Sequence, residues 1–292
     1  MYKLFMEFEK PEGRIGDADW SVQGFAAADG LGFVLYHTGV CAVYDLVTRN
    51  PKPLCVFKLG SYNDGTPDGR YINHANDAMF GGRLGKNELP LLYVTAGNSG
   101  EADENGYIAY CAVEQIRRNG DSFTAETVQR IYYKNEGIEN TRFQSPCWGW
   151  PASLVDAEGG YYYTFSAKYR TIKQFSRPDN AYIVTKFALP SPEISKVTLY
   201  PSDIIDQFEL PFNVFFTQGG TLKDEKIWYL FGCASKDYPD ALNVIDLKNK
   251  CYAACEDLSA SVLAKEEVEC CAFHDGRLLI NTQGCKLYER VE

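Results

Sequence analysis

The sequence predicts an all-β protein, a β-propeller with five blades favoured, formed by residues 1–292 as a single domain. Three observations predict it. Turn signals recur along the chain, each followed by aromatic-rich segments of strand length. Long helical periodicity is nearly absent. The last repeat lacks one strand, and the N-terminus has a strand that no neighbour in the sequence pairs with.

Alignment on acidic or glycine-containing turns gives five repeat units. Residues in these turns tolerate a positive φ or bond to their own backbone, as tight hairpins require. The turns are Asp29-Gly30, Gly81-Gly82, Asp156 to Gly160, Asp224-Glu225 and Asp275-Gly276. We expect second strands at 33–36, 91–94, 161–165, 227–231 and 278–280, and third strands at 40–46, 107–113, 181–189, 242–247 and 286–291. Fourth strands are expected at 54–59, 127–133, 196–200 and 251–254.

The fifth unit ends after its third strand, whereas residues 2–8 alternate like a strand and have no partner nearby. Donation of this strand to the last blade closes the ring and removes two exposed sheet edges. A β-sandwich is the structural alternative, but it does not predict a terminal repeat that lacks one strand. Six blades are the other alternative, if the long third unit contains a split. The only helical candidate, residues 112–118, reads equally well as a strand.

Composition narrows the class of partner. The chain has 292 residues, of which 45% are hydrophobic and 14% aromatic, as in a globular protein rich in strands. A net charge of −10 argues against nucleic acid and anionic membranes, because a phosphate-binding face needs clustered Lys and Arg. No apolar run approaches the roughly 20 residues of a membrane span.

The N-terminal residues predict a cytoplasmic location. Glu7 and Glu9 interrupt what would have to be an uncharged signal core, so we predict no export signal. The ten cysteines are then expected as reduced thiols. A chain from which a signal had been removed would read the same, and an exported protein is therefore the alternative.

One residue per unit is predicted to meet at the mouth of the central channel. Counting six positions back from each turn, or seven in the second unit, reaches Gln23, His74, Trp150, Gln218 and Glu269, at the start of the innermost strands. Four of them can hydrogen bond and Trp150 offers a flat ring, which is typical of a small-ligand site. Small residues follow them, as packing near the axis requires. The alternative is that the ring binds only channel water.

Loops that precede the innermost strands add further candidates. Asp19 precedes the first strand, Asn76 and Asp77 follow His74, and Trp148 precedes Trp150. The segment around His74 is the densest polar patch of the chain. His37 and His274 are interpreted as structural residues at strand ends.

Specific chemistry has limited support in the sequence. A glycosidase needs two carboxyl groups, about 6.5–9.5 Å apart for inversion or about 5 Å apart for retention, and Asp19, Asp77 and Glu269 are its candidates. No metal site is predicted, because the adjacent Cys270 and Cys271 point to opposite faces of a strand. Residues 64–69 have the composition of a calcium loop without its spacing. No nucleophile elbow and no phosphate-binding glycine loop occurs, and no cofactor is predicted.

The second unit resembles a group of uncharacterised bacterial propeller proteins of the TolB-like type. The segments that carry the resemblance are residues 73–80, 89–94, 121–131 and 183–190. It covers about a third of the chain and implies a TolB-like or similar propeller. It implies no reaction, because that group has no agreed activity. Those relatives are mostly exported, unlike the location predicted above.

Three functions follow as hypotheses. The first is a binding propeller that holds a small polar ligand, such as a saccharide, with Gln23, His74, Asn76, Asp77, Trp148, Trp150, Gln218 and Glu269 around the site. The second is an enzyme like a glycoside hydrolase, with Asp19, Asp77 and Glu269 as its catalytic carboxyl groups. The third is a protein-interaction scaffold that uses the rim loops.

Overall fold

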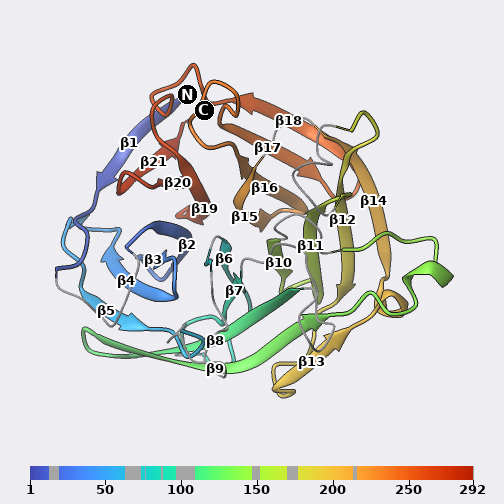
Figure 1. Cartoon of the computed structure of the whole chain (residues 1–292). Helices are drawn as coiled ribbons and strands as arrows, with labels where there is room; N and C mark the ends of the chain where they lie inside the picture. Colours follow the sequence, from blue (N-terminus) through green and yellow to red (C-terminus); the bar gives the residue numbers. More distant parts are fainter. Residues whose placement is uncertain are drawn as a thin grey trace.

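The chain folds as a five-bladed β-propeller, which confirms the predicted fold class (Figure 1). The computed structural model describes residues 1–12, 20–62, 74–75, 77–86, 88–96, 109–146, 152–169, 177–212 and 216–291. Each blade is one sheet, and the innermost strands β2, β6, β10, β15 and β19 surround the central axis. In these residues no helix is long and apolar enough to cross a membrane.

The five blades are numbered here in chain order. Blade 1 consists of β2 (Val22–Ala28), β3 (Leu31–Tyr36), β4 (Val40–Asp45) and β5 (Cys55–Lys58). Blade 2 consists of β6 (Asp77–Phe80), β7 (Leu92–Ala96), β8 (Ala109–Asn119) and β9 (Ser122–Tyr133), with β13 (Lys196–Leu199) outside β9. Blade 3 consists of β10 (Ala152–Asp156), β11 (Tyr161–Ala167), β12 (Ala181–Ala188) and β14 (Asp206–Pro211).

Blade 4 consists of β15 (Thr217–Lys223), β16 (Lys226–Phe231), β17 (Ala241–Asp246) and β18 (Cys251–Asp257). Blade 5 consists of β19 (Val268–His274), β20 (Arg277–Thr282), β21 (Lys286–Arg290) and β1 (Tyr2–Glu7). Two 3-10 turns, η1 (Ile138–Asn140) and η2 (Pro201–Asp203), lie in connections. The candidate helix at 112–118 belongs to strand β8.

The tight turns between the two innermost strands have the conformation that their residues predict. Asp29 and Gly30 have φ of 52° and 77°, and Asp275 and Gly276 have φ of 48° and 77°. Positive φ at both central residues is the geometry of a type I′ hairpin, whose twist matches that of the flanking strands. In blades 1 and 5 these turns therefore reverse the chain directly from the innermost strand into the second strand.

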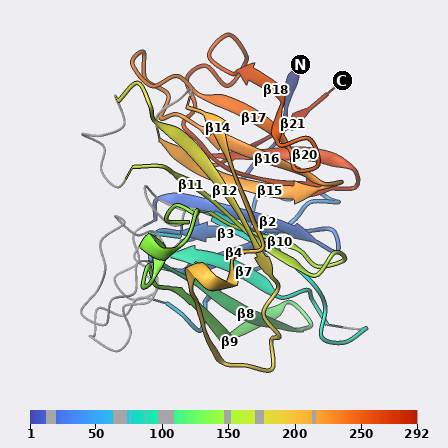
Figure 2. The same cartoon turned by 90° about the vertical axis from the view of Figure 1, so that its right-hand side faces the viewer.

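The N-terminal strand closes the ring, as predicted. Strand β1 pairs antiparallel with β21, from Tyr2 opposite Arg290 to Glu7 opposite Lys286. The amide of Val291 also donates to the carbonyl of Met1 at 2.8 Å, and Figure 2 shows the two termini side by side. Blade 5 thus obtains its outermost strand from the opposite end of the chain.

The predicted fourth strand of the third unit is wrong. Residues 196–199 form β13, which pairs parallel with β9 of blade 2, and the fourth strand of blade 3 is β14. The side chain of Gln129 holds the preceding segment by donating to the carbonyls of Ser191 and Ile194, at 2.6 and 2.8 Å. Periodicity identifies a strand but does not identify its partner. The polar sequence of β14 also gives little strand signal.

The apolar core lies between neighbouring blades. Separate groups of buried side chains fill the interfaces, for example Phe33 and Leu92 between blades 1 and 2, and Leu230 and Ile280 between blades 4 and 5. The inner strands pack most tightly. A Cβ atom at Gly24 would lie 2.8 Å from the carbonyl oxygen of Ala75 in blade 2. Small residues near the axis are therefore a packing requirement, as the sequence predicts.

Candidate functional site

A bulge at the start of three innermost strands positions the residues predicted to face the channel mouth. The strand register shifts between Val22 and Phe25 in β2, between Thr217 and Gly220 in β15, and between Val268 and Cys270 in β19. Gln23, Gln218 and Glu269 lie inside these bulges. β-Bulges reorient side chains and are common next to functional sites. Three successive blades thus present an amide or carboxyl group at the same level.

The sequence alignment of the ring is wrong in the other two blades. Two aromatic contacts occupy equivalent positions in the propeller, one between Phe33 and Phe80 and the other between Trp228 and Phe273. The centroids of the aromatic rings are 5.0 and 5.5 Å apart, and the angles between the ring planes are 81° and 83°. Glu269 precedes Phe273 by four residues, and the residue that precedes Phe80 by four is Asn76. Counting back from the turn therefore placed His74 two residues too early.

In blade 3, Asp156 pairs with Tyr161 just as Ala28 pairs with Leu31 in blade 1. Relative to the last residue pair of the two hairpins, the count in blade 3 therefore starts one residue too early. The count failed because Asp156 is the last paired residue of β10 and not the first residue of the turn. Connections of different length separate the inner strands of the five blades, and no single offset fits them all.

Four of the predicted mouth residues lie outside the described residues. They are Asp19, Asn76, Trp148 and Trp150, together with the candidate calcium loop at 64–69. The structure therefore places Gln23, His74, Asp77, Gln218 and Glu269.

Gln23, Gln218 and Glu269 are buried, with exposed fractions of 4%, 8% and 2%. The amide nitrogen of Gln218 donates to the carbonyl of Gly232 at 2.7 Å. In contrast, the Oε1 atoms of Gln23 and Glu269 have no hydrogen-bond partner among the described residues. Leaving a buried acceptor without a donor costs about 1–3 kcal/mol, so each atom calls for a donor from water or a ligand.

Asn281 fixes the two strands that carry these unpartnered atoms. Its side-chain oxygen accepts from the amide of Cys270 at 2.7 Å, and its side-chain nitrogen donates to the carbonyl of Gln23 at 2.9 Å. Asn281 is fully buried. It bridges β19 and β2 directly beside Glu269 and Gln23, and therefore holds the two acceptors at a fixed separation.

Two acidic residues that the sequence reasoning missed accompany Glu269. Asp240, in the connection before β17, and Glu267, just before β19, both act on Glu269 electrostatically. Burial raises the pKa of Glu269 well above its usual range, and the nearby Glu267 and Asp240 raise it further. Burial also raises the pKa of Glu267, and it raises the pKa of Asp240 to about 6.

The spacing of Glu267 and Glu269 was an available signal, because residues two apart on a strand share a face. Asp240 had no such signal. Its connection reaches blade 5 only in the folded ring, where its carboxylate accepts from the amides of Ala234, at 2.8 Å, and Val268. Asp240 also lines a cavity of about 270 Å³ together with Ser235, Lys236 and Ser259. The acidic group therefore adjoins an open space on the mouth side of blade 4.

Asp77 lies inside the channel and joins four blades. Its two carboxylate oxygens accept from the amide of Gly220 in blade 4 at 3.0 Å and from the amide of Ser153 in blade 3 at 3.2 Å. The thiol of Cys270 in blade 5 donates to it at 3.7 Å. The residue is fully buried, which raises its pKa to about 7. In this position Asp77 plugs the axis rather than lining an open mouth.

Beyond the plug, the channel opens again on the opposite face. A hollow of about 170 Å³ is lined there by the inner-strand residues Ala26, Ala78, Thr221, Ala272 and Phe273. Its lining is mostly small and apolar. The two ends of the channel therefore differ in chemistry, and the polar mouth is the end suited to a hydrogen-bonding ligand.

His74 lies on the mouth side between blades 1 and 2. Its ring packs edge-to-face on His37, with centroids 4.5 Å apart. The carbonyl of His37 accepts from the amide of Ala75 at 3.2 Å, and the carbonyl of Ala75 accepts from Gly24 at 2.8 Å. His74 is partly exposed. His37 thus supports a predicted site residue, a contact that its strand-end position did not reveal.

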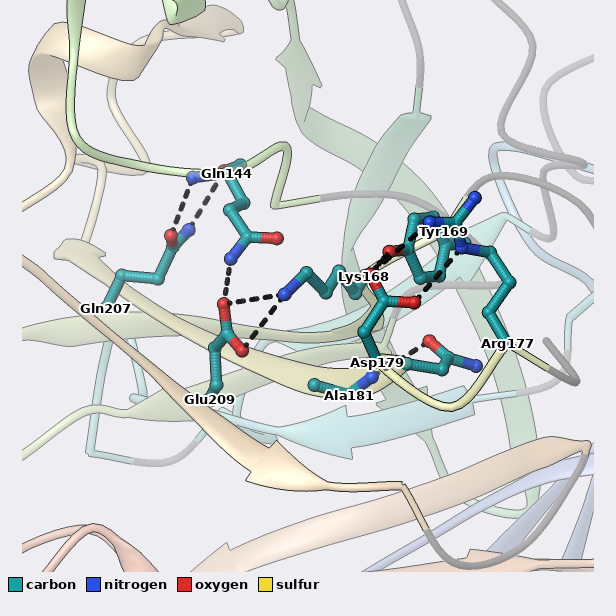
Figure 3. A network of polar contacts seen from close by, with 9 residues as sticks. Gln144, Lys168, Tyr169, Arg177, Asp179, Ala181, Gln207 and Glu209 are labelled. Carbon is teal, nitrogen blue, oxygen red and sulfur yellow. Dashed lines mark hydrogen bonds and ion pairs between the residues drawn. The ribbon is translucent and has the colours of Figure 1, made fainter. Parts of the chain in front are cut away.

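A polar network occupies the mouth-side rim of blade 3 (Figure 3). Glu209 of β14 accepts from Gln144 and pairs with Lys168 at 3.3 Å. Next to it, Asp179 accepts from Tyr169 and from Arg177, and the Arg177 guanidinium holds the pKa of Asp179 down at about 2. Hydrogen bonds between Gln144 and Gln207 join the segment before blade 3 to its outermost strand. The network orders this part of the rim.

Cysteine and metal chemistry find no organised centre in the described part of the chain. Its nine cysteines are free, and Cys270 and Cys271 are both fully buried. No group of three or more His, Cys, Asp or Glu side chains there is arranged to hold a metal ion.

Comparison of the sequence with protein-family models and with curated proteins finds no match. Among solved structures, the chain is similar to the glutaminyl cyclase of Myxococcus xanthus, with a TM-score of 0.51 and 12% identity over 99% of this chain and 94% of that one. It is also aligned with Raptor of Chaetomium thermophilum, with a TM-score of 0.41 and 12% identity over 95% of this chain and 20% of Raptor. The likeness to the cyclase concerns the fold alone, a β-propeller over almost the full length of both chains.

Proposed function

We propose that this protein binds a small polar ligand at the channel mouth, between Glu269 and Gln23. The observation that carries the proposal is the pair of buried acceptor oxygens on neighbouring inner strands, neither with a donor among the described residues. A ligand that brings hydroxyl or N–H donors removes the cost of both at once. A saccharide or an amide-bearing metabolite has such donors.

The proposed site extends from this pair to both sides. Gln218 of blade 4 and Glu267, which lies just before β19, flank Glu269. His74 lies on the blade 2 side of Gln23. The predicted residues Asn76, Trp148 and Trp150 belong to the proposal as ring and hydrogen-bonding groups. A cytoplasmic location and a TolB-like type remain predictions of the sequence.

Titration calorimetry with mono- and disaccharides and with glutamine-containing dipeptides tests the proposal. For a ligand that binds, Glu269→Ala removes one acceptor and weakens binding at least tenfold. Glu269→Gln keeps one acceptor and has a smaller effect. The matched control is Glu126→Ala on the exposed surface of the β8–β9 hairpin of blade 2, which leaves the affinity unchanged. Equal affinities of the wild type and a folded Glu269→Ala variant refute the proposal.

A second candidate function is proton transfer to a bound amide, and the raised pKa values of Glu269 and Asp240 favour it. Carboxyl groups that retain a proton near neutral pH serve as general acids. The structural neighbour from Myxococcus xanthus is a glutaminyl cyclase, and we extend that activity to this chain as a proposal only.

In such a cyclisation, the α-amino nitrogen of an N-terminal glutamine bonds to its side-chain amide carbon, and the amide C–N bond breaks to release ammonia. Protonated Glu269 gives its proton to the departing nitrogen, and its carboxylate takes the proton that the attacking nitrogen loses. Ammonia release from glutaminyl dipeptides measures the reaction. Activity that survives in Glu269→Gln contradicts this role.

The glycosidase hypothesis has less support from the geometry. Asp77, one of its three carboxyl groups, is fully buried, and both of its oxygens accept bonds from backbone amides. Glu269 then has Asp19 as its remaining partner in that hypothesis. The scaffold hypothesis rests on the rim, where the ordered network of blade 3 offers an exposed polar surface.

A further inference from the structure

A groove of about 380 Å³ opens between blades 4 and 5, on the face opposite the channel mouth. This face carries the β15–β16 and β19–β20 turns and the end of β21. The residues that give the groove its character are Lys223, Lys226, Trp228, Phe273, Arg277 and Arg290. A volume of this size lies within the range of small-molecule sites, roughly 300–1,000 Å³.

The equivalent interface between blades 1 and 2 is filled, which shows that the groove is a local feature. There the Phe33–Phe80 pair corresponds to Trp228–Phe273. Leu31 covers it at the position of Lys226, and Phe123 packs on Phe33 with a centroid distance of 6.0 Å. Phe33 is completely buried, whereas Trp228 is partly exposed.

The closure of the ring explains the difference. Phe123 lies at the start of β9, near the tip of the long hairpin that joins the third and fourth strands of blade 2. In blade 5 those two strands are β21 and β1, and no hairpin joins them. Blade 5 instead lines the groove between blades 4 and 5 with residues of β19, the β19–β20 turn, β20 and the end of β21.

The groove is cationic in a chain with a net charge of −10. Neither Lys223 nor Lys226 forms an ion pair among the described residues, and Lys226 lies opposite Asp246 in the β16–β17 pairing. Lys223 lies over the ring of Phe273, 4.5 Å from its centroid. Arg277 reaches Glu289 at 3.4 Å, but Glu289 is already paired with Lys3 at 2.9 Å. The lining holds four basic side chains against the carboxylates of Asp224 and Glu289, and this excess of positive charge next to two aromatic rings favours an anion.

We propose that this groove is a second binding site, for a small organic anion that carries an aromatic ring. The ring packs on the exposed part of Trp228, next to Phe273, and the acidic group lies between the ammonium groups of Lys223 and Lys226. Stacking and charge act together here, because Lys223 lies over the ring of Phe273 and Lys226 lines the same groove as Trp228. The site is independent of the function proposed for the mouth, since it lies on the other face.

Calorimetric titration with four probes tests the proposal and distinguishes the anionic groups. The probes are indole-3-acetate, adenosine monophosphate, inorganic phosphate, and benzyl alcohol as a ring without charge. At least one ring-bearing anion binds at least tenfold more tightly than phosphate or benzyl alcohol. The comparison of the first two probes tells a carboxylate site from a phosphate site. Higher salt weakens the binding, as for any partly exposed ionic contact.

Variants separate the two contributions. Lys226→Glu weakens the ring-bearing anion at least tenfold, and Trp228→Leu lowers its affinity to that of the ring-free anion. Lys186→Ala is the matched control, because Lys186 lies over the ring of Tyr161 at 3.3 Å, in blade 3 and outside the groove. It leaves binding unchanged, as does Glu269→Ala at the mouth. Absence of binding by both ring-bearing anions at millimolar concentration, or unchanged affinity in Lys226→Glu, overturns the proposal.

Discussion

Asp77 connects blade 2 to three other blades through a single carboxyl group. Its hydrogen bonds to Gly220, Ser153 and Cys270 join the innermost strands of blades 4, 3 and 5 to that of blade 2. Burial raises its pKa from 3.8 in the unfolded chain to about 7. Between these values the folded protein retains a proton that the unfolded chain has lost. The free energy of unfolding therefore falls as the pH rises from about 4 to 7.

Asp77→Asn removes this pH dependence. The side-chain amide of asparagine cannot ionise. Its nitrogen cannot accept the hydrogen bond that a carboxylate oxygen of Asp77 accepts from a backbone N–H group, so the variant is less stable than the wild type at pH 4.5. The difference from the wild type shrinks by about 3 kcal/mol as the pH rises to 7.5. Urea unfolding at three pH values measures it. The exposed Asp246→Asn serves as control, and parallel stability curves for the wild type and Asp77→Asn contradict the prediction.

Gly220 is required where β15 passes the plug. A Cβ atom at this position would lie 2.3 Å from Cδ2 of Tyr229 and 2.7 Å from the carbonyl oxygen of Trp228. We expect Gly220→Ala to destabilise the protein by about 1–3 kcal/mol, as overpacking does. In Gly82→Ala the nearest atom is the Cβ of Ala157 at 3.6 Å, so this control changes stability by less than about 0.5 kcal/mol. Equal thermal unfolding temperatures of the two variants contradict the argument.

At the scale of the element, β1 depends on packing as well as on pairing with β21. Phe5 is 5% exposed and packs in the core between blades 5 and 1, with the guanidinium of Arg49 4.1 Å from its ring centroid. Its neighbour Leu4 is 47% exposed. Burial along β1 does not alternate strictly, because Phe5 and Met6 are both buried where the register with β21 shifts between Leu4 and Met6.

Phe5→Ala and Leu4→Ala form a matched pair of variants. Phe5→Ala is expected to cost about 3–5 kcal/mol, because it empties a buried aromatic site. Leu4→Ala is expected to cost less than about 0.5 kcal/mol. Guanidinium unfolding monitored by circular dichroism measures both. Similar losses in the two variants would mean that β1 is held by its backbone alone.

Strands β13 and β14 show where element-level prediction from sequence stops. The sequence of β13 indicates a strand, but its parallel partner β9 lies about 65 residues earlier in the chain. The bonds from Gln129 to Ser191 and Ile194 that hold the connection exist only after blade 2 has formed. Long-range pairing of this kind leaves no local periodic pattern.

At the scale of the whole molecule, ring closure makes the five blades interdependent. Each blade buries its faces against two neighbours, and Asp77 joins four blades at the axis. We therefore expect one cooperative unfolding transition. Tryptophan fluorescence and far-ultraviolet circular dichroism should give the same midpoint in guanidinium. Two separated transitions would show that part of the ring unfolds independently.

The sequence by itself determined the all-β class, the five repeats and the closing strand. Turn residues, aromatic strands and alternation are local patterns, and they state where strands begin and which face they bury. The same patterns located Gln23, Gln218 and Glu269, because in blades 1, 4 and 5 a tight turn follows the innermost strand at the same distance.

Only the tertiary structure decided what surrounds those residues. It showed that the turn offset that fits blades 1, 4 and 5 does not apply in blades 2 and 3, since connections of unequal length separate their inner strands. It brought Asp240 to Glu269 across a blade boundary and turned Asp77 into a plug. It also left the cationic groove uncovered between blades 4 and 5. These outcomes depend on contacts between blades, and burial and charge at such contacts are set by distance in space rather than in sequence.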